Sequence, residues 1–559
     1  MSPTSSYAAA LATLLAFASP SLAAEKAPYA RLSPAFNSAW KNPLPIPEIK
    51  KPLTSIKNPD TGAPIDFYEI EVKSFKHKFF PNLQEADLVG YDGAFPGPVF
   101  HVEKGRETVV RVVNRDADRL GRAPWDGWAN DGIPSGHYKD YYYPNAAARM
   151  LWYHDHINKE SAINAYRGLV GVYNIIDSTL DKSLNLPTGA YDIPLVLTAH
   201  YFTPSGGLSN ERAEHNSIYG DTFLVNGAIQ PALAVEPRKY RFRILNAAVS
   251  RVFNLTLTDD KGAVVPVAVV GSDGGYRAAP AAARSLLLGM AERWEVVVDF
   301  KGLEGKALTL ATHDVWTDAK YKGSGEMLRF NVERSVKDTS GNELPKSFGV
   351  DLRFPSGKAV KRQMGGMGNM GGMMGGMGNM GGMGGMGGMM GGMGGMGGMM
   401  GDNLKWTHAL HMHLVDIQLI SRRKDNASLP EGRSYLEPYE VGSVKDTIVL
   451  GSNEVVEVLA KFTPYPGVYM FHCHNFVHSD QGMMAAFNVT RLADMGYSEL
   501  EARLEDPMDA RFRSKAYTGT NLDEVRTKVL PMFAGLKAYP DIRALEKLED
   551  KYWAAKTAA

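Results

Sequence analysis

The histidines of this sequence gather in pairs of the form His-x-His. Among 559 residues there are 14 histidines, for which random placement predicts fewer than one such pair. Three pairs occur, at His154 and His156, His411 and His413, and His472 and His474. Each pair lies in strand-like sequence, and residues two apart on a strand point to the same face. The pairs therefore predict six imidazoles that converge on a centre binding several metal ions.

Cys473, the only cysteine, indicates a second kind of metal site. On a strand its thiol points away from the histidines on either side, so it serves a different metal ion from theirs. His408, His478 and Met483 stand nearby in the sequence. Two imidazoles, one thiolate and a weak axial thioether are the ligands of a blue-copper site, which accepts one electron at a time. The strand then connects the two sites covalently, which predicts oxidation of a donor at one and reduction of dioxygen at the other.

The elements that position these residues are expected to be β-strands. Short runs rich in β-branched and aromatic residues, punctuated by glycine, proline and aspartate, occupy residues 65–176, 191–336 and 404–491. Such runs are typical of sandwiches and barrels, and three units of similar size favour small repeated barrels over one large sheet. After residue 491 the sequence becomes charged and helix-favouring. An all-β fold with a helical C-terminal extension is therefore predicted.

The sequence around the metal-binding candidates resembles the multicopper oxidase family. Residues 408–413 (HALHMH) and 472–484 (HCHNFVHSDQGMM) resemble its third and fourth copper motifs, and residues 151–156 (LWYHDH) resemble the second. Four further stretches are similar to the bilirubin oxidase branch: 126–131, 139–145, 165–173 and 240–251. The resemblance implies three cupredoxin-like (Greek-key β-barrel) domains, with a type 1 copper in the third and a trinuclear copper cluster between the first and third.

This resemblance also implies a ligand set for each copper. Type 1 copper would be bound by His408, Cys473, His478 and the axial Met483, and type 2 copper by His411. The type 3 pair would use His154, His156, His413, His472 and His474. Asp126 matches an acid that helps deliver protons to reduced oxygen, although a turn or capping role is an equal alternative. Trp406 would contact flat aromatic donors or belong to the core.

The first copper motif of the family, His-x-His-Gly, is absent from this sequence. It should follow the strand-like residues 107–114 and precede residues 126–131, but no histidine lies between them. One type 2 ligand and one type 3 ligand are thereby missing, so His411 would be the only protein ligand of type 2 copper. Two explanations are open: a truncated gene model or splice form of a working oxidase, or a true variant that only binds copper or transfers electrons. Loss of a barrel strand should also expose backbone edges.

The expected organisation of the chain has seven parts. These are a signal peptide (1–23), an N-terminal arm (24–65), cupredoxin domain 1 (66–180), cupredoxin domain 2 (190–336), a Met/Gly-rich mobile loop (364–401), cupredoxin domain 3 (402–493) and a C-terminal helical extension (494–559). The loop holds 15 of the 26 methionines. It is either an expanded linker or a thioether-rich patch that binds Cu(I) and makes the protein an oxidase of cuprous ions.

Composition limits the partners of the protein. Lysine plus arginine equals aspartate plus glutamate, at 61 each, so no net charge favours nucleic acid. The only long apolar run, residues 8–18, suits a signal peptide, and no later segment reaches the roughly 20 apolar residues of a membrane span. Secretion is therefore expected, and three sequons fit a glycoprotein: Asn254, Asn426 and Asn488. The expected partners are dioxygen, an aromatic (phenolic) or tetrapyrrole electron donor such as bilirubin, and Cu(I) at the Met-rich loop.

Overall fold

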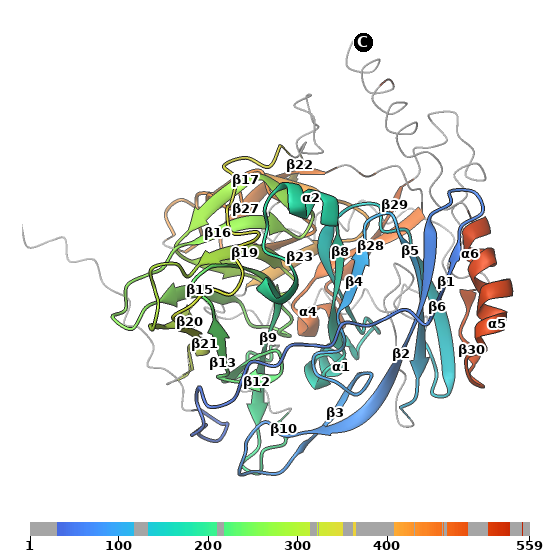
Figure 1. Ribbon diagram of the computed structural model, residues 1–559, viewed down its shortest axis with the longest axis horizontal. Helices are drawn as coiled ribbons and strands as arrows, with labels where there is room; N and C mark the ends of the chain where they lie inside the picture. Colours follow the sequence, from blue (N-terminus) through green and yellow to red (C-terminus); the bar gives the residue numbers. More distant parts are fainter. Residues whose placement is uncertain are drawn as a thin grey trace, which may run out of the picture.

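A computed structural model describes most of the three predicted β-rich units. The described residues are 31–116, 132–209, 217–313, 321, 324–349, 362–364, 407–429, 431–460, 462, 467–489, 512–536 and 551. Asp126, Trp406, the predicted signal peptide and residues 365–401 of the predicted loop lie outside this set. In the described parts, strands far outweigh helices and form three pairs of sheets, here called barrels 1, 2 and 3 (Figure 1).

Barrel 1 joins a six-stranded sheet, in the order β1-β2-β5-β6-β30 with β3 on β2, to the three-stranded sheet β4-β8-β7. Its strands are β1 (Thr54–Lys57), β2 (Pro64–His77), β3 (Ala86–Tyr91), β4 (Phe100–Glu103), β5 (Glu107–Asn114), β6 (His137–Tyr143), β7 (Arg149–His154), β8 (Val170–Ile176) and β30 (Lys515–Ala516). Every residue of β5 is buried, as expected for a central strand covered on both faces. Two helices, α1 (Ser161–Arg167) and α2 (Ser178–Ser183), flank β8.

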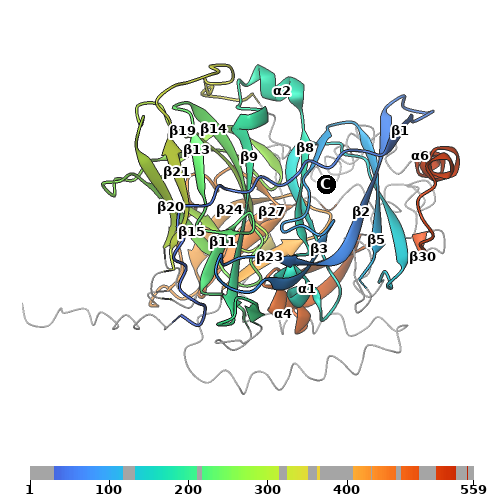
Figure 2. The ribbon, with the colours of Figure 1, turned by 60° about the horizontal axis from the view of Figure 1, so that its bottom comes forward.

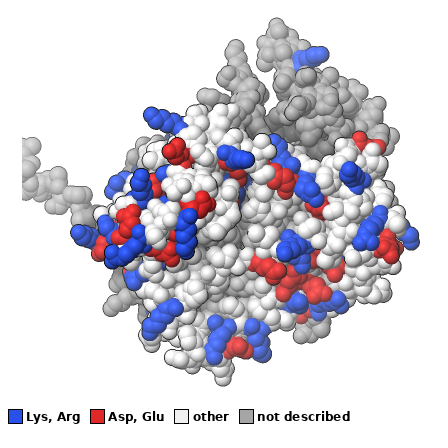
Figure 3. All heavy atoms as spheres, viewed as in Figure 1, with Lys and Arg blue, Asp and Glu red and all other residues white. Residues whose placement is uncertain are grey.

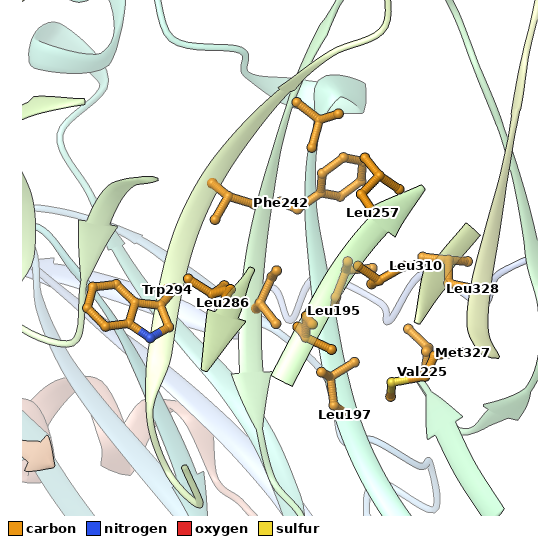
Figure 4. Packing of buried hydrophobic residues seen from close by; sticks show 14 of the residues in the cluster. Leu195, Leu197, Val225, Phe242, Leu257, Leu286, Trp294, Leu310, Met327 and Leu328 are labelled. Carbon is orange, nitrogen blue, oxygen red and sulfur yellow. The ribbon is translucent and has the colours of Figure 1, made fainter. Parts of the chain in front are cut away.

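Barrel 2 has an eight-stranded sheet, in the order β12-β11-β9-β14-β19-β16-β17 with β10 on β9, and the five-stranded sheet β13-β21-β20-β15-β18. Its strands are β9 (Asp192–Phe202), β10 (Leu208–Ser209), β11 (Thr222–Val225), β12 (Ala228–Ile229), β13 (Ala232–Val235), β14 (Lys239–Asn246), β15 (Phe253–Thr258), β16 (Val267–Ser272), β17 (Gly275–Ala283), β18 (Leu286–Leu288), β19 (Arg293–Asp299), β20 (Ala307–His313) and β21 (Glu326–Val332). Side chains from both sheets, among them Leu195, Phe242 and Leu328, fill the space between them (Figure 4).

Barrel 3 consists of two four-stranded sheets, β22-β27-β24-β25 and β26-β23-β28-β29. Its strands are β22 (Arg362–Met364), β23 (His408–Met412), β24 (Ile417–Lys424), β25 (Val444–Lys445), β26 (Thr447–Leu450), β27 (Glu454–Ala460), β28 (Gly467–Cys473) and β29 (Met484–Val489). The short helix α4 (Phe476–Asp480) follows β28. It inserts Phe476 and Val477 into an apolar cluster that also contains residues of barrels 1 and 2, and this packing holds the three barrels together.

The described part of the C-terminal extension packs on barrel 1. It comprises β30, α5 (Leu522–Glu524), a π-helical turn (Val525–Val529) and α6 (Leu530–Gly535), seen at one edge of the molecule in Figure 2. Phe533 packs with Phe67 and Val109 of the barrel sheet. Because β30 pairs with β6, one end of that strand's outer edge is covered, where the missing motif predicted an exposed edge.

The outer surface agrees with the balanced composition. Acidic and basic side chains are interspersed over the face shown in Figure 3. Across the described residues, no helix combines the length and apolar character needed to traverse a bilayer. The all-β prediction is confirmed, whereas the bounds of the seven predicted parts stay a prediction.

Candidate metal centre

Strand pairing brings the histidine motifs together. Strands β23 and β28 are antiparallel neighbours, and their register sets His411 opposite His472. The second barrel 1 sheet ends at His154, and helices α1 and α4 lie side by side across the boundary between barrels 1 and 3 (Figures 1 and 2). There the Ala162 amide donates to the Asp480 carboxylate at 2.9 Å. All six paired histidines consequently lie at the junction of these two barrels.

Cys473 lies beside the two predicted type 1 histidines. Its Sγ is 3.4 Å from Nδ1 of His408 and 3.6 Å from Nδ1 of His478, and these two nitrogens are 3.3 Å apart. Burial raises the pKa of the Cys473 thiol to about 12 and lowers the pKa of His408 to about 4. The His408 imidazole is therefore neutral at neutral pH, the form that binds metal ions, whereas the thiolate needs a cation beside it. Two imidazoles and one sulfur suit copper.

The loop after β28 holds this group in shape. The Asn475 side chain accepts a hydrogen bond from the Val477 amide and so starts α4, which carries His478. The Cys473 amide donates to the Met483 carbonyl at 3.0 Å, and the Met483 amide donates to the His478 carbonyl at 3.0 Å. The predicted axial residue is thus tied through its backbone to two predicted ligands.

A second group is formed by three imidazoles, those of His156, His413 and His472. Nε2 of His472 lies 3.1 Å from Nε2 of His156 and 3.3 Å from Nε2 of His413. The Nδ1 of His472 is 3.2 Å from the Cys473 carbonyl, which can only accept, so Nδ1 carries the proton and Nε2 offers its lone pair. Three converging imidazole nitrogens of this kind fit one transition-metal ion.

The other three paired histidines lie around this group. The ring centroid of His474 is 5.1 Å from that of His154 and 5.5 Å from that of His411. Nδ1 of His154 donates to the Asp155 carbonyl at 2.8 Å, and Nδ1 of His411 donates to the Asp446 carbonyl at 2.9 Å. Within the described ranges, however, potential ligand atoms converge in two groups only, and these three histidines belong to neither.

Several neighbours of the centre were not among the predicted site residues. Trp152 covers two of the rings, with centroid distances of 4.3 Å to His154 and 5.3 Å to His474. Its position two residues before His154 on β7 was a usable signal, because such residues share a face. Asp446 and Thr447, which contact His411, lie more than 30 residues from it, and no local pattern marks them.

Comparisons with known proteins agree with this geometry. Models described as multicopper oxidase match residues 191–313 and 398–492. The chain is 40% identical over 509 residues to a bilirubin oxidase of Albifimbria verrucaria, covering 87% of each chain. It is 29% identical over 517 residues to a laccase of Bacillus subtilis (strain 168), covering 80% of this chain and 98% of that one. A multi-copper oxidase structure from Pediococcus acidilactici covers 84% of this chain and 94% of its own, with a TM-score of 0.63 and 21% identity. This likeness confirms the cupredoxin-like fold class.

Proposed function

Because this chain belongs to the multicopper oxidase family and to its bilirubin oxidase branch, it is an oxidoreductase with oxygen as acceptor, and we propose that its donors are phenols or tetrapyrroles such as bilirubin. Each donor molecule would lose one electron at a time, and dioxygen would be reduced to water. The 40% identity to a bilirubin oxidase supports this donor class.

The observation that carries the proposal is the position of Cys473 beside His408 and His478. In the sequence Cys473 is bonded directly to His472 of the other group and to His474, which lies around that group. Copper bound to these residues would supply the one-electron redox chemistry. Strand β28 supplies a continuous covalent connection between the sulfur and the imidazoles of His472 and His474. The hydrogen bonds of His154 and His472 to backbone carbonyls fix which ring nitrogen faces the centre.

Purified protein of this sequence tests the proposal. We expect an intense blue absorption from a copper–thiolate bond, more than one copper per chain, and oxygen uptake that depends on bilirubin or a phenol. A blue protein that consumes no oxygen with any of these donors would refute the oxidase proposal for this chain.

A copper-binding or electron-transfer protein is the second candidate. It is favoured by the absence of the first copper motif and by the position of His154, His411 and His474 outside the two converging groups. This candidate predicts one tightly bound copper per chain rather than several. Metal analysis after gel filtration separates the two candidates.

Oxidation of Cu(I) is the third candidate function, supported by the methionines of residues 364–401. Deleting this segment should slow cuprous oxidation selectively, while bilirubin oxidation continues. Unchanged cuprous kinetics would reject a role for the segment. We also propose that the chain is secreted, on the evidence of its apolar N-terminal run.

A further inference from the structure

Arg293 of β19 lies where the three barrels meet. Its Nε donates to the Met150 carbonyl of β7 in barrel 1 at 3.0 Å. Nη1 and Nη2 bind the two carboxylate oxygens of Asp446 in barrel 3 at 2.7 and 2.6 Å. Nη1 also donates to the Ala291 carbonyl in barrel 2 at 2.9 Å. Only 1% of Arg293 is exposed, so these contacts replace solvent entirely. One side chain therefore joins all three barrels.

Asp446 in turn holds His411. The His411 Nδ1 donates to the Asp446 backbone carbonyl at 2.9 Å and lies 3.1 Å from Oγ1 of Thr447. The Thr447 hydroxyl also donates to the Asp446 carboxylate at 2.9 Å. Because the carbonyl fixes the proton on Nδ1, Nε2 of His411 is left to face the metal centre. The orientation of this ring depends on where Asp446 is held.

A loop of barrel 2, which contains Asp273 and Gly274, also contacts the segment around Asp446. Asp273, which is fully buried, accepts from the Arg293 amide at 2.7 Å and from the amides of Asp446 and Thr447 at 3.2 and 3.3 Å. At Gly274 a Cβ would lie 2.3 Å from a Val444 methyl group, so only glycine allows the loop to approach β25 this closely. Barrel 2 thus contacts the chain before Asp446, at Val444, and after it, at Thr447.

We propose that Arg293 is a positioning residue, which fixes the His411 imidazole relative to strand β7 by holding Asp446 and Met150 at once. Barrel 2 carries no predicted copper ligand, yet it would set the geometry of the metal centre between barrels 1 and 3. The inference depends on the proposed function for its copper chemistry. It matters most in this chain because the missing motif leaves His411 without a second protein ligand for type 2 copper.

Arg293→Lys and Asp446→Asn test this role in the copper-loaded protein. Lysine keeps the charge but cannot make the forked contact, and asparagine cannot accept from both guanidinium nitrogens. We expect both variants to keep the blue absorption, to change the electron paramagnetic resonance signal of the copper at His411, and to lose that copper to a chelator about 10- to 100-fold faster. Thr447→Val should act in the same direction and less.

The matched control is Arg243→Lys. Arg243 lies on the neighbouring strand β14 and makes a buried forked pair with Asp192 at 2.9 Å, without contact to Met150 or Asp446. It should lower the melting temperature and leave the resonance signal and the copper release unchanged. If Arg293→Lys changes these two readouts no more than the control does, the inference is wrong.

Hydrogen exchange in copper-free protein separates this inference from the proposed function. Amides of residues 444–450 and 149–154 should exchange about tenfold faster in Arg293→Lys than in Arg243→Lys. Equal exchange in the two variants contradicts the positioning role even where copper binds. Faster exchange in a protein whose wild type takes up no second copper would support the positioning role and overturn the oxidase proposal instead.

Discussion

The two candidate metal sites differ in where their ligands come from. Those of the Cys473 group all belong to barrel 3 and lie on β23, β28 and α4, which are neighbours in one sheet and its following turn. The three-imidazole group takes His156 from barrel 1 and the other two from barrel 3. Beside it, His411 contacts Asp446, which Arg293 of barrel 2 binds. A site within one barrel forms when that barrel folds, whereas a site between barrels depends on their docking. Because α4 also packs against barrels 1 and 2, changes to docking should affect the second site more than the first, rather than the second alone.

Removing the sulfur should have the largest effect. Cys473→Ser deletes the thiolate, the ligand on which the blue-copper assignment depends. We expect the blue absorption and all donor oxidation to disappear, with one copper fewer per chain. The three-imidazole group should still bind metal, since none of its ligand atoms changes. A blue Cys473→Ser protein would overturn the assignment of this group.

His413→Ala should give the reverse result. It removes one of three converging nitrogens, and the Cys473 group remains intact. We expect a blue protein whose copper is reduced by donors but is not reoxidised by oxygen. The control is His313→Ala, which changes the exposed last residue of β20, far from both groups in the sequence, and should behave as wild type. Normal oxygen uptake by His413→Ala would contradict the importance of the three-imidazole group.

Docking of barrels 1 and 3 can be weakened at Arg149. Its guanidinium binds Asp416 through two hydrogen bonds, of 2.7 and 3.0 Å. Arg149→Met leaves a largely buried carboxylate without this partner, which should cost about 3 kcal/mol of unfolding free energy. Denaturant titration measures this loss. Copper should leave the three-imidazole group faster, while the blue absorption persists. Equal loss from both sites would show that their stabilities are not separable.

The stability of copper-free protein should fall in acid. Burial lowers the pKa of His408 to about 4 and, with His408 beside it, lowers that of His478 to about 3. In the unfolded chain these groups titrate near about 6.5. Between these values the unfolded state binds more protons, so stability is full above about pH 6.5 and decreases as pH falls toward 4.

Urea titrations of copper-free protein at several pH values measure this effect. His408 alone should account for up to about 3 kcal/mol. In His408→Gln the pH dependence should be weaker but present, because burial also lowers the pKa of His472 in the other group and of His154 beside it. A pH-independent wild type would contradict the buried, neutral state of these imidazoles.

The site within barrel 3 could be predicted from the sequence better than the contacts between barrels. The alternation of His472, Cys473 and His474 on one strand already separates two metal sites, because strand geometry alone turns neighbours to opposite faces. The contact of His411 with Asp446, and of Asp446 with Arg293, joins segments 35 and 153 residues apart. Such contacts arise from the docking of barrels, for which a single sequence carries no periodic signal.

The C-terminal extension also contains a contact between distant segments that the sequence does not predict. Its helix-favouring composition predicted helices, and α5 and α6 are present. The two-residue strand β30 was not predicted, since strand periodicity needs about four residues to be recognised. It pairs with the edge of β6, a strand more than 370 residues earlier in the sequence.

Trp152→Phe should have the smallest effect, and it tests how strictly the second site depends on its surroundings. The indole ring covers His154 and His474 but donates no ligand atom to either converging group. Phenylalanine keeps an aromatic face and loses part of the buried area, so the expected cost is about 1 kcal/mol, measured by denaturant titration. Copper release from the second site should accelerate less than in Arg149→Met, and the blue absorption should be unchanged. Release as fast as in Arg149→Met would mean that local covering of the rings matters as much as docking, and the contrast between the two sites would then reflect packing rather than the origin of their ligands.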